Sequence, residues 1–142
     1  GIEFIVDDQD MELANSHHWY CTPKGYIHTF IHGKNTRLHR IIMQAKPGEV
    51  VDHIDGNPKN NQRSNLRMCT AQQNCFHRKP CKNYSAYKGI SKSKSKNKWY
   101  SVIILNGKKQ WIGSFDKEED AARAYDEVAK KYHKEFAWLN FK

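Results

Sequence analysis

An aspartate–histidine pair followed by two spaced asparagines is the feature that most constrains this chain. The four residues are Asp52, His53, Asn65 and Asn74. A carboxylate and a carboxamide oxygen can bind one hard divalent cation together. A neutral imidazole beside that cation can take a proton from water. The set therefore predicts a site that hydrolyses phosphodiester bonds with the help of one metal ion.

The sequence around these residues predicts a hairpin followed by a helix. Residues 49–54 are typical of a strand, a turn at 55–58 leads out of it, and residues 65–69 return as a second strand. Thr70 and Gln73 form a capping box, in which the threonine accepts from the third backbone amide and the glutamine reaches back. The helix that starts there carries the second asparagine in its first turn, so we expect it to pack across the hairpin.

Upstream of this segment the chain predicts a small sheet and a short helix. Residues 19–21 and 26–31 are typical of strands around a turn at 22–25, and a second turn is expected at 32–35. Residues 36–45 carry apolar side chains at helical spacing, which predicts a helix.

Charge divides the chain into two parts. Residues 1–80 carry ten Lys and Arg against eight Asp and Glu, whereas residues 81–142 carry fourteen against seven. The polar, proline-bearing stretch at 79–85 suits a linker. We therefore expect two domains, at 1–80 and 83–142.

The second half predicts three strands and one long helix. The strands are expected at 87–91, 99–105 and 109–113. Asn106 and Gly107 form a strong hairpin turn, and a capping pattern at 116–119 starts a helix that runs to about Tyr132. The core side of this half is predicted to hold Ala121, Ala124, Tyr125, Val128 and Tyr132 of the helix, and Phe136, Trp138, Leu139 and Phe141 of the tail.

Composition limits the possible partners and compartments. The formal net charge of +9 favours a polyanion, and no apolar run reaches the ~18 residues of a membrane span. The first residues lack the basic and apolar regions of a secretory signal, so we expect a cytoplasmic protein. Reduced thiols are expected there, with zinc bound by cysteines and histidines as the alternative. The cysteines, none in a Cys-x-x-Cys pair, are Cys21, Cys69, Cys75 and Cys81.

The segment from Leu38 to Asn74 resembles the HNH homing-endonuclease family, in the branch whose last motif position is asparagine. The motif residues stand at 51–57, 60–61, 64–67 and 70–74. The resemblance implies a ββα-metal fold that binds one Mg²⁺ or Mn²⁺. The basic residues expected to contact double-stranded DNA in this half are Arg40, Lys59, Arg63 and Arg67.

The same resemblance implies a role for each residue of the set. Asp52 and Asn74 are metal ligands, and His53 is the general base that activates water. Asn65 bonds across the loop and fixes the orientation of His53. The products are a 3′-hydroxyl and a 5′-phosphate. A lone active site favours nicking by a monomer or a weak dimer.

Three neighbouring positions keep two interpretations each. Asp55 precedes a glycine, which favours a turn over a further metal ligand. His77 follows on the same helix face as the last motif residue, either as an extra ligand or phosphate contact or as a solvated side chain. His39 and Arg40 either touch DNA or lie on an exposed helix face.

Residues 85–141 resemble the plant ethylene-response-factor (Apetala-type) DNA-binding domain. The matching runs are 87–90, 98–99, 111–115, 118–126 and 139–141. The resemblance implies a three-stranded antiparallel sheet laid in the major groove, with a helix packed behind it. The lysines expected to contact phosphates are Lys88, Lys92, Lys94, Lys96, Lys98, Lys108 and Lys109.

Four side chains of this half depart from the family or keep alternatives open. The places where the plant domains carry arginines hold mainly lysine, serine or apolar residues here, including Val102 and Ile104, so arginine readout of guanine is not expected. Tyr100, Val102 and Ile104 are expected to lie together on the presented face. Their apolar stripe either meets thymine methyls or docks on the nuclease half. Trp111 either stacks on a sugar or belongs to the core, to which Trp99 is assigned.

Together these observations predict an α+β protein in which a nuclease module precedes a DNA-binding module. The leading hypothesis is a metal-dependent DNA endonuclease of the homing type, from a phage or another mobile element. A non-catalytic DNA-binding regulator with a vestigial nuclease module is the first alternative. A zinc-stabilised nucleic-acid-binding protein without hydrolysis is the second.

Overall fold

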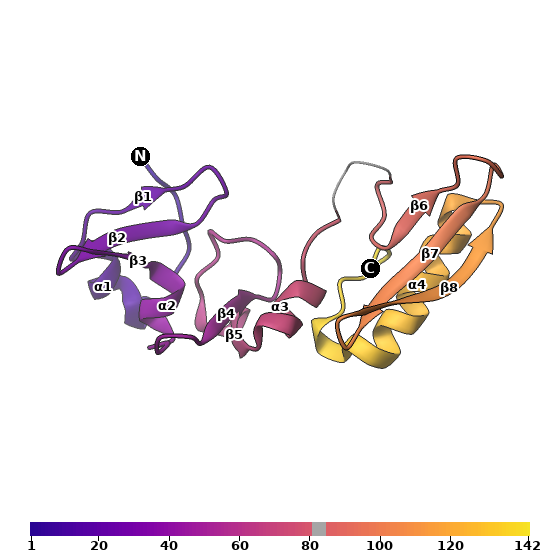
Figure 1. Cartoon of the computed structure of the whole chain (residues 1–142). Coiled ribbons are helices and arrows are strands. Elements are labelled where there is room, and N and C mark those ends of the chain that lie inside the picture. The colour runs from indigo at the N-terminus through magenta and orange to yellow at the C-terminus, as the bar shows by residue number, and fades with distance from the viewer. Residues whose placement is uncertain (81–84) are drawn as a thin grey trace. The chain divides into compact units, whose positions relative to one another are not determined.

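The computed structural model describes residues 1–80 and 85–142, which divide into two compact units, Gly1–Asn74 and Cys75–Lys142 (Figure 1). The division comes before the stretch at 79–85 that was expected to be a linker, and residues 81–84 of that stretch lie outside the described residues. The fold is mixed, with small antiparallel sheets and few helices. None of the described helices is long and apolar enough to span a lipid bilayer.

The first unit opens with a small antiparallel sheet in the strand order β1-β2-β3. The third strand was not predicted. His32 and Gly33 both have positive φ, 48° and 74°, which makes a two-residue hairpin turn and lets the chain return as a strand at once. The elements are η1 (Asp8–Asp10), α1 (Met11–Asn15), β1 (Tyr20–Cys21), β2 (Ile27–Ile31) and β3 (Lys34–Arg37).

Helix α2 (Leu38–Ile42) is shorter than the helix predicted at 36–45. Its start is later because the two preceding residues belong to β3, and its end is earlier because Gln44 has a φ of 50°, in the left-handed region. The helix packs on β2 and β3. The core of this unit consists of Ile27, Leu38, Ile42, Val51 and Leu66.

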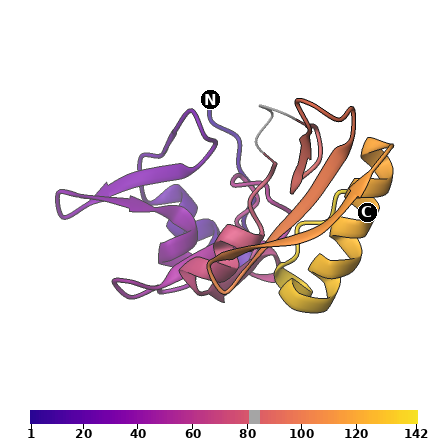
Figure 2. The same ribbon diagram turned by 45° about the vertical axis from the view of Figure 1, so that its right-hand side comes forward.

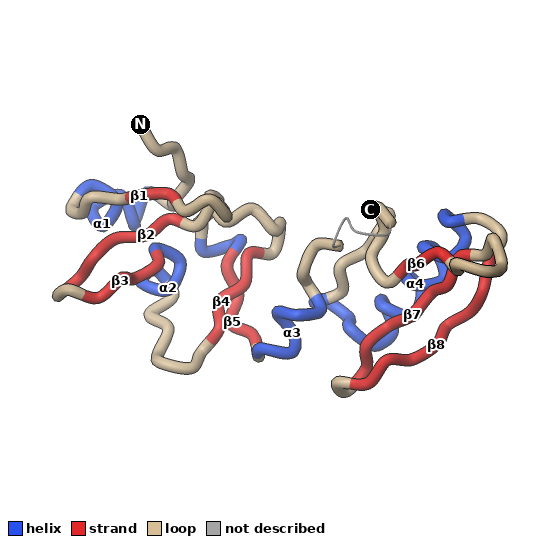
Figure 3. The backbone as a smooth tube through the Cα atoms, turned by 45° about the horizontal axis from the view of Figure 1, so that its top comes forward, coloured by secondary structure: helices blue, strands red, loops and turns tan. Residues whose placement is uncertain are grey.

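The predicted hairpin and helix are present (Figure 3). Strands β4 (Val50–His53) and β5 (Leu66–Cys69) pair antiparallel, a short η2 (Arg63–Asn65) precedes β5, and α3 (Ala71–Phe76) follows it. The capping box is confirmed. The amide of Thr70 donates to Oε1 of Gln73 over 2.8 Å, and the amide of Gln73 donates to Oγ1 of Thr70 over 3.1 Å.

The second unit is a three-stranded antiparallel sheet, in the order β6-β7-β8, with one helix along one face (Figure 2). Asn106 and Gly107 have φ values of 50° and 75°, so the predicted tight turn is confirmed. The elements are β6 (Ile90–Lys92), β7 (Trp99–Leu105), β8 (Lys108–Phe115), α4 (Glu118–His133) and η3 (Lys134–Phe136).

Helix α4 turns a slightly different face to the sheet than predicted. Tyr132 is 52% exposed, so its assignment to the core is wrong. His133 is buried instead, because its imidazole bonds the carbonyl of Ile104 over 3.0 Å and stacks on Phe76. The buried residues of the helix are Ala121, Ala122, Tyr125, Asp126, Ala129 and His133.

The ends of α4 differ in how well they were predicted. Among the described residues no side chain caps the first turn, so the expected capping pattern is wrong; Ser85 Oγ instead donates to Glu118 over 2.6 Å. The tail does return to the core. The buried carboxylate of Asp126 accepts from the backbone amides of Asn140 and Phe141, both over 2.9 Å.

Candidate functional site

The β4–β5 hairpin buries the aspartate–histidine pair at the end of a strand. Asp52 and His53 are only 7% and 5% exposed. The strand register sets Asp52 opposite Arg67 and His53 opposite Leu66. Val51 packs into the core of the unit. Strand β4 therefore places a carboxylate and an imidazole where both are almost completely shielded from solvent.

The carboxylate of Asp52 forms an ion pair with Arg67. Its Oδ2 accepts from Nε over 3.0 Å and from Nη2 over 2.7 Å. Both side chains are largely buried, so each charge depends on the other for solvation. Arg67 was predicted to contact DNA, and the structure uses its guanidinium inside the site.

Asn61 orients the imidazole of His53. Its side chain is fully buried, and its Oδ1 lies 3.3 Å from Nε2 of His53, while its Nδ2 donates to the carbonyl of Pro58. With the amide oxygen facing the ring, Nε2 carries the proton and Nδ1 keeps a free lone pair. The sequence places Asn61 in the motif but does not predict its role, because the contact of its side chain with His53 depends on the fold.

The surroundings of His53 favour its neutral form. Burial lowers the pKa of His53, although the bond to Asn61 and the nearby carboxylates Asp55 and Asp52 oppose this shift. The ring of His39 stands edge-on to it at 4.9 Å, and that of Tyr26 lies 6.2 Å away. These rings keep water from one side of the base, and an uncharged imidazole is the form that accepts a proton.

His39 itself is a buried neutral histidine, so both interpretations of it as a surface residue are wrong. It is 3% exposed, and burial, helped by His53, Arg37 and Arg40, lowers its pKa to about 3. Its Nδ1 has no hydrogen-bond partner among the described residues. The helical spacing that suggested an exposed face did not reveal that α2 turns this side inward.

The side chain of Asn65 holds the loop between the two strands by hydrogen bonds. Its Oδ1 accepts from the amide of Asp55 over 3.0 Å, and its Nδ2 donates to the carboxylate of Asp55 and to the carbonyl of Asn60, both over 2.9 Å. Burial raises the pKa of Asp55, but hydrogen bonds from Asn57, Asn60 and Asn65 outweigh it, and the pKa is lowered overall. Asp55 thus acts as the acceptor of a turn.

The N-terminal segment braces the same loop from outside. Ile5 donates to the carbonyl of Lys59 and accepts from the amide of Asn61. The guanidinium of Arg63 makes two bonds to Asp10, of 2.9 and 2.7 Å. The acidic stretch that begins the chain therefore holds the residue that orients the base.

Two residues of this site carry oxygen donors of the kind that a divalent cation takes. Asp52 offers a buried carboxylate, and Asn74, on the helix that follows β5, offers a carboxamide oxygen. Both are hard oxygen donors, which suit Mg²⁺ or Mn²⁺. Across residues 1–80 and 85–142 no three His, Cys, Asp or Glu side chains are grouped to hold a metal ion. Cys81, part of the zinc alternative, lies outside the described residues.

The other basic residues predicted to contact DNA in the first unit have different surroundings. Arg40 donates to the backbone carbonyls of Glu49 and Lys46, so it closes the loop after α2. Arg63 is tied to the N-terminal segment, and Lys59 is exposed. His77, in the second unit, packs edge-on to a tryptophan ring.

The seven lysines of the second unit that were predicted to contact phosphates separate into two groups. Lys88 donates to the carbonyls of Phe76 and Arg78, and Lys98 pairs with Asp116. Lys92 stands over the ring of Trp99 at 5.4 Å. The first group is thus engaged within the unit, and the remaining lysines are exposed: Lys94, Lys96, Lys108 and Lys109.

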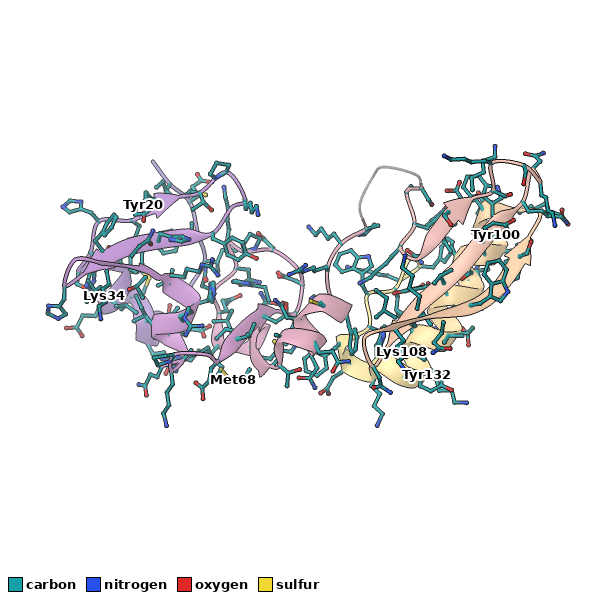
Figure 4. All side chains as sticks on the ribbon, in the orientation of Figure 1. Tyr20, Lys34, Met68, Tyr100, Lys108 and Tyr132 are labelled. Atoms are coloured by element: carbon teal, nitrogen blue, oxygen red, sulfur yellow. The ribbon has the colours of Figure 1, made fainter. Side chains whose placement is uncertain are left out.

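The sheet face of the second unit that points away from α4 carries an aromatic and aliphatic stripe. Ser101 and Ile103 point inward and are buried; the residues that alternate with them, starting with Tyr100, point outward (Figure 4). Trp111 is 60% exposed and lies 4.9 Å from the Tyr100 ring, so the alternative that placed it in the core is wrong. Ile104 is 50% exposed beside Lys109. The face can meet both apolar and anionic groups.

Comparisons with known proteins show what the chain is similar to. A family model described as HNH endonuclease matches residues 36–75. An uncharacterized HNH endonuclease of Acanthamoeba polyphaga mimivirus is 36% identical over 134 residues, covering 90% of this chain and 69% of that protein. Protein 3.8 of Escherichia phage T7 is 34% identical over 110 residues, covering 73% and 90%. An AP2-like ethylene-responsive transcription factor of Arabidopsis thaliana is 33% identical over 88 residues, covering 53% of this chain and 21% of that protein.

Proposed function

The chain belongs to the HNH endonuclease family, and on that premise we propose that it is a metal-dependent DNA endonuclease. It hydrolyses a phosphodiester to a 3′-hydroxyl and a 5′-phosphate, and one active site in a monomer nicks one strand. The observation that carries the proposal is the buried Asp52–His53 pair, whose imidazole is oriented by Asn61. Similarity to a phage protein supports a homing-type role in a phage or another mobile element.

His53 acts as the general base. Nδ1 takes a proton from water while the water oxygen attacks phosphorus, and the bond between phosphorus and the 3′ oxygen breaks. The departing 3′ oxygen takes a proton from solvent. Asn61 holds the ring so that Nδ1 faces the water, and burial keeps the imidazole neutral. Asn65 contributes indirectly, by fixing the loop that carries Asn61.

Asp52 and Asn74 would hold the cation, in what we propose is a ββα-metal arrangement of β4, β5 and α3. The chemistry that Mg²⁺ or Mn²⁺ would supply there is stabilisation of negative charge on the phosphate and on the leaving oxygen. Arg67 shares the carboxylate of Asp52 and adds positive charge beside it.

Relaxation of supercoiled plasmid in the presence of Mg²⁺ tests this proposal. His53→Ala should lower the nicking rate by roughly 10²–10⁴-fold, the usual contribution of a general base, while DNA affinity stays close to that of the wild type. His18→Ala, which changes an exposed histidine of the same unit, should nick normally. Full activity of His53→Ala would remove this residue from the mechanism.

The second unit we propose as a DNA-binding module of the AP2 type. Its support is the similarity to AP2-like factors over about half of the chain, together with exposed lysines beside an outward Trp111. Neutralising phosphates releases counterions, so binding should weaken as salt rises. A combined change of Lys92, Lys94 and Lys96 to alanine should weaken binding and flatten the salt dependence.

One observation favours a second candidate, a DNA-binding regulator without catalysis. Arg67 already neutralises Asp52, as it would in a site that no longer binds metal. The two candidates differ in one result: a regulator binds DNA but leaves supercoiled plasmid intact at any concentration of Mg²⁺ or Mn²⁺.

A further inference from the structure

The N-terminal sheet has an outer face that the proposed chemistry does not use. The register sets Tyr20 opposite His28, His28 opposite Arg37, and Phe30 opposite Asn35. Because alternate residues of a strand share a face, these five side chains lie on one side of the sheet. The opposite side holds the core residues of β2. We call this set of five side chains the outer face.

The outer face is an ordered aromatic surface. Phe30 is 61% exposed and Tyr20 is partly exposed, whereas His28 of the same face is buried. The ring of Phe30 stacks on Tyr20, with centroids 5.8 Å apart and planes 26° apart, and Tyr20 in turn contacts His28 at 5.5 Å. His28 Nδ1 bonds Asn35 Oδ1 over 2.6 Å. These contacts hold the exposed ring in place, so it can bind a partner with little loss of side-chain entropy.

The outer face runs on to the active site through two side chains. The guanidinium of Arg37 lies over the ring of Tyr26, 5.2 Å from its centroid. The same ring lies 6.2 Å from that of His53. A row of aromatic and basic side chains therefore leads from Phe30 to the general base, all within the first unit, and Tyr20 at its start is labelled in Figure 4.

The charge around this row selects the partner. No Asp or Glu occurs between Glu12 and Glu49 in the sequence, whereas Lys24, Lys34 and Arg37 in this stretch are exposed. A polyanion with flat apolar parts matches both the aromatic rings and this charge, and DNA has phosphates beside sugars and bases.

We propose that the outer face binds the duplex DNA next to the cleaved phosphate, with Arg37 on a backbone phosphate and the Phe30–Tyr20 pair against sugar or thymine methyl groups. This inference rests on the proposed function, because it takes DNA as the substrate. It adds a binding surface to the first unit that lies mostly upstream of the matched family segment at 36–75, with Arg37 inside that segment.

Binding of the full chain to a fluorescein-labelled duplex of mixed sequence, with Ca²⁺ in place of Mg²⁺, tests the inference without cleavage. Arg37→Gln should lower the slope of log affinity against log salt by about one unit, as loss of one phosphate contact predicts. Lys130→Gln, which removes the same charge from α4, should leave the slope closer to the wild-type value. Equal slopes for wild type and Arg37→Gln would overturn the phosphate contact.

The aromatic pair has its own matched comparison. Phe30→Ser should weaken binding roughly tenfold, the scale of one aromatic contact to a nucleotide, with an unchanged salt slope. Met11→Ser, at another exposed apolar side chain of the unit, should bind like the wild type. If Phe30→Ser binds as well as the wild type, the face is not a DNA surface.

A measurement on the unmodified protein covers the case in which Phe30→Ser does not fold. Duplexes with 5-iododeoxyuridine in place of thymidine should crosslink under ultraviolet light to Phe30 or Tyr20, as located by peptide mass spectrometry. Crosslinks confined to other residues overturn the inference. Because neither assay uses cleavage, an inactive protein that still binds through this face would refute the nuclease proposal alone.

Discussion

Replacing Asn61 with aspartate should turn the bond that orients His53 into a charged pair. Asn61 is fully buried, its Oδ1 lies 3.3 Å from Nε2 of His53, and aspartate has nearly its shape. A unit charge at such a distance favours the imidazolium by roughly 5 kcal/mol at an effective dielectric constant of about 20. Burying the new carboxylate offsets part of that energy, so we expect the pKa of His53 to rise by about 1–3 units.

The sign of the effect follows from the role of the base. Only neutral imidazole accepts a proton, and burial holds the pKa of His53 below 6.5 in the native protein. The acid limb of the single-turnover nicking rate should therefore move up by about 1–3 pH units in Asn61→Asp. Asn57→Asp adds the same charge at an exposed position of the same loop, and it should move the acid limb of the nicking rate much less. Superimposable pH profiles of Asn61→Asp and wild type, both folded, would refute the reasoning.

Three further changes test other parts of the structure. His39 has a folded-state pKa of about 3 against 6.5 when unfolded, so only the unfolded chain gains its proton between these values; stability should fall by about 1.4 kcal/mol per pH unit below pH 6.5. In urea unfolding, the free energy of unfolding of His39→Gln should depend less on pH than that of the wild type. The same pH dependence in both proteins would contradict this prediction. Gly89→Ala should lower Tm more than Gly107→Ala, since both have positive φ, costing about 1–3 kcal/mol, but only at Gly89 would a methyl group overlap a ring of α4; equal losses would exclude that overlap. Arg67→Met should tighten Mn²⁺ binding in calorimetry by removing the competitor for Asp52, and weaker binding would show that the guanidinium supports the site.

Features that depend on local chemistry were predictable from the sequence. The capping box at Thr70 and Gln73 and the turn at Asn106 and Gly107 are bonds and backbone angles within a few residues, so residue types suffice to recognise them. The hairpin with its following helix was predictable for the same reason. Strand β3 was missed because its turn requires a positive φ at His32, and the presence of a histidine does not predict that conformation.

Features that depend on distant partners were not predictable. The basic loop residue Arg63 was expected to meet DNA, but its partner Asp10 lies far away in the sequence. Asn61 could be recognised as a motif residue, yet its contact with His53 appears only when the loop folds back over the strand. The sequence does not show whether an arginine or asparagine side chain faces solvent or bonds inside a buried site, because its burial depends on the fold.

Counting Mn²⁺ bound to the protein by electron paramagnetic resonance tests the central claim most directly. We predict one tight site per chain in the wild type, with affinity lowered at least tenfold in Asp52→Asn and in Asn74→Ala, as loss of one of two protein ligands implies. His53→Ala should bind Mn²⁺ nearly as the wild type does, because the imidazole moves a proton and holds no metal. Unchanged Mn²⁺ binding in both Asp52→Asn and Asn74→Ala would contradict the account.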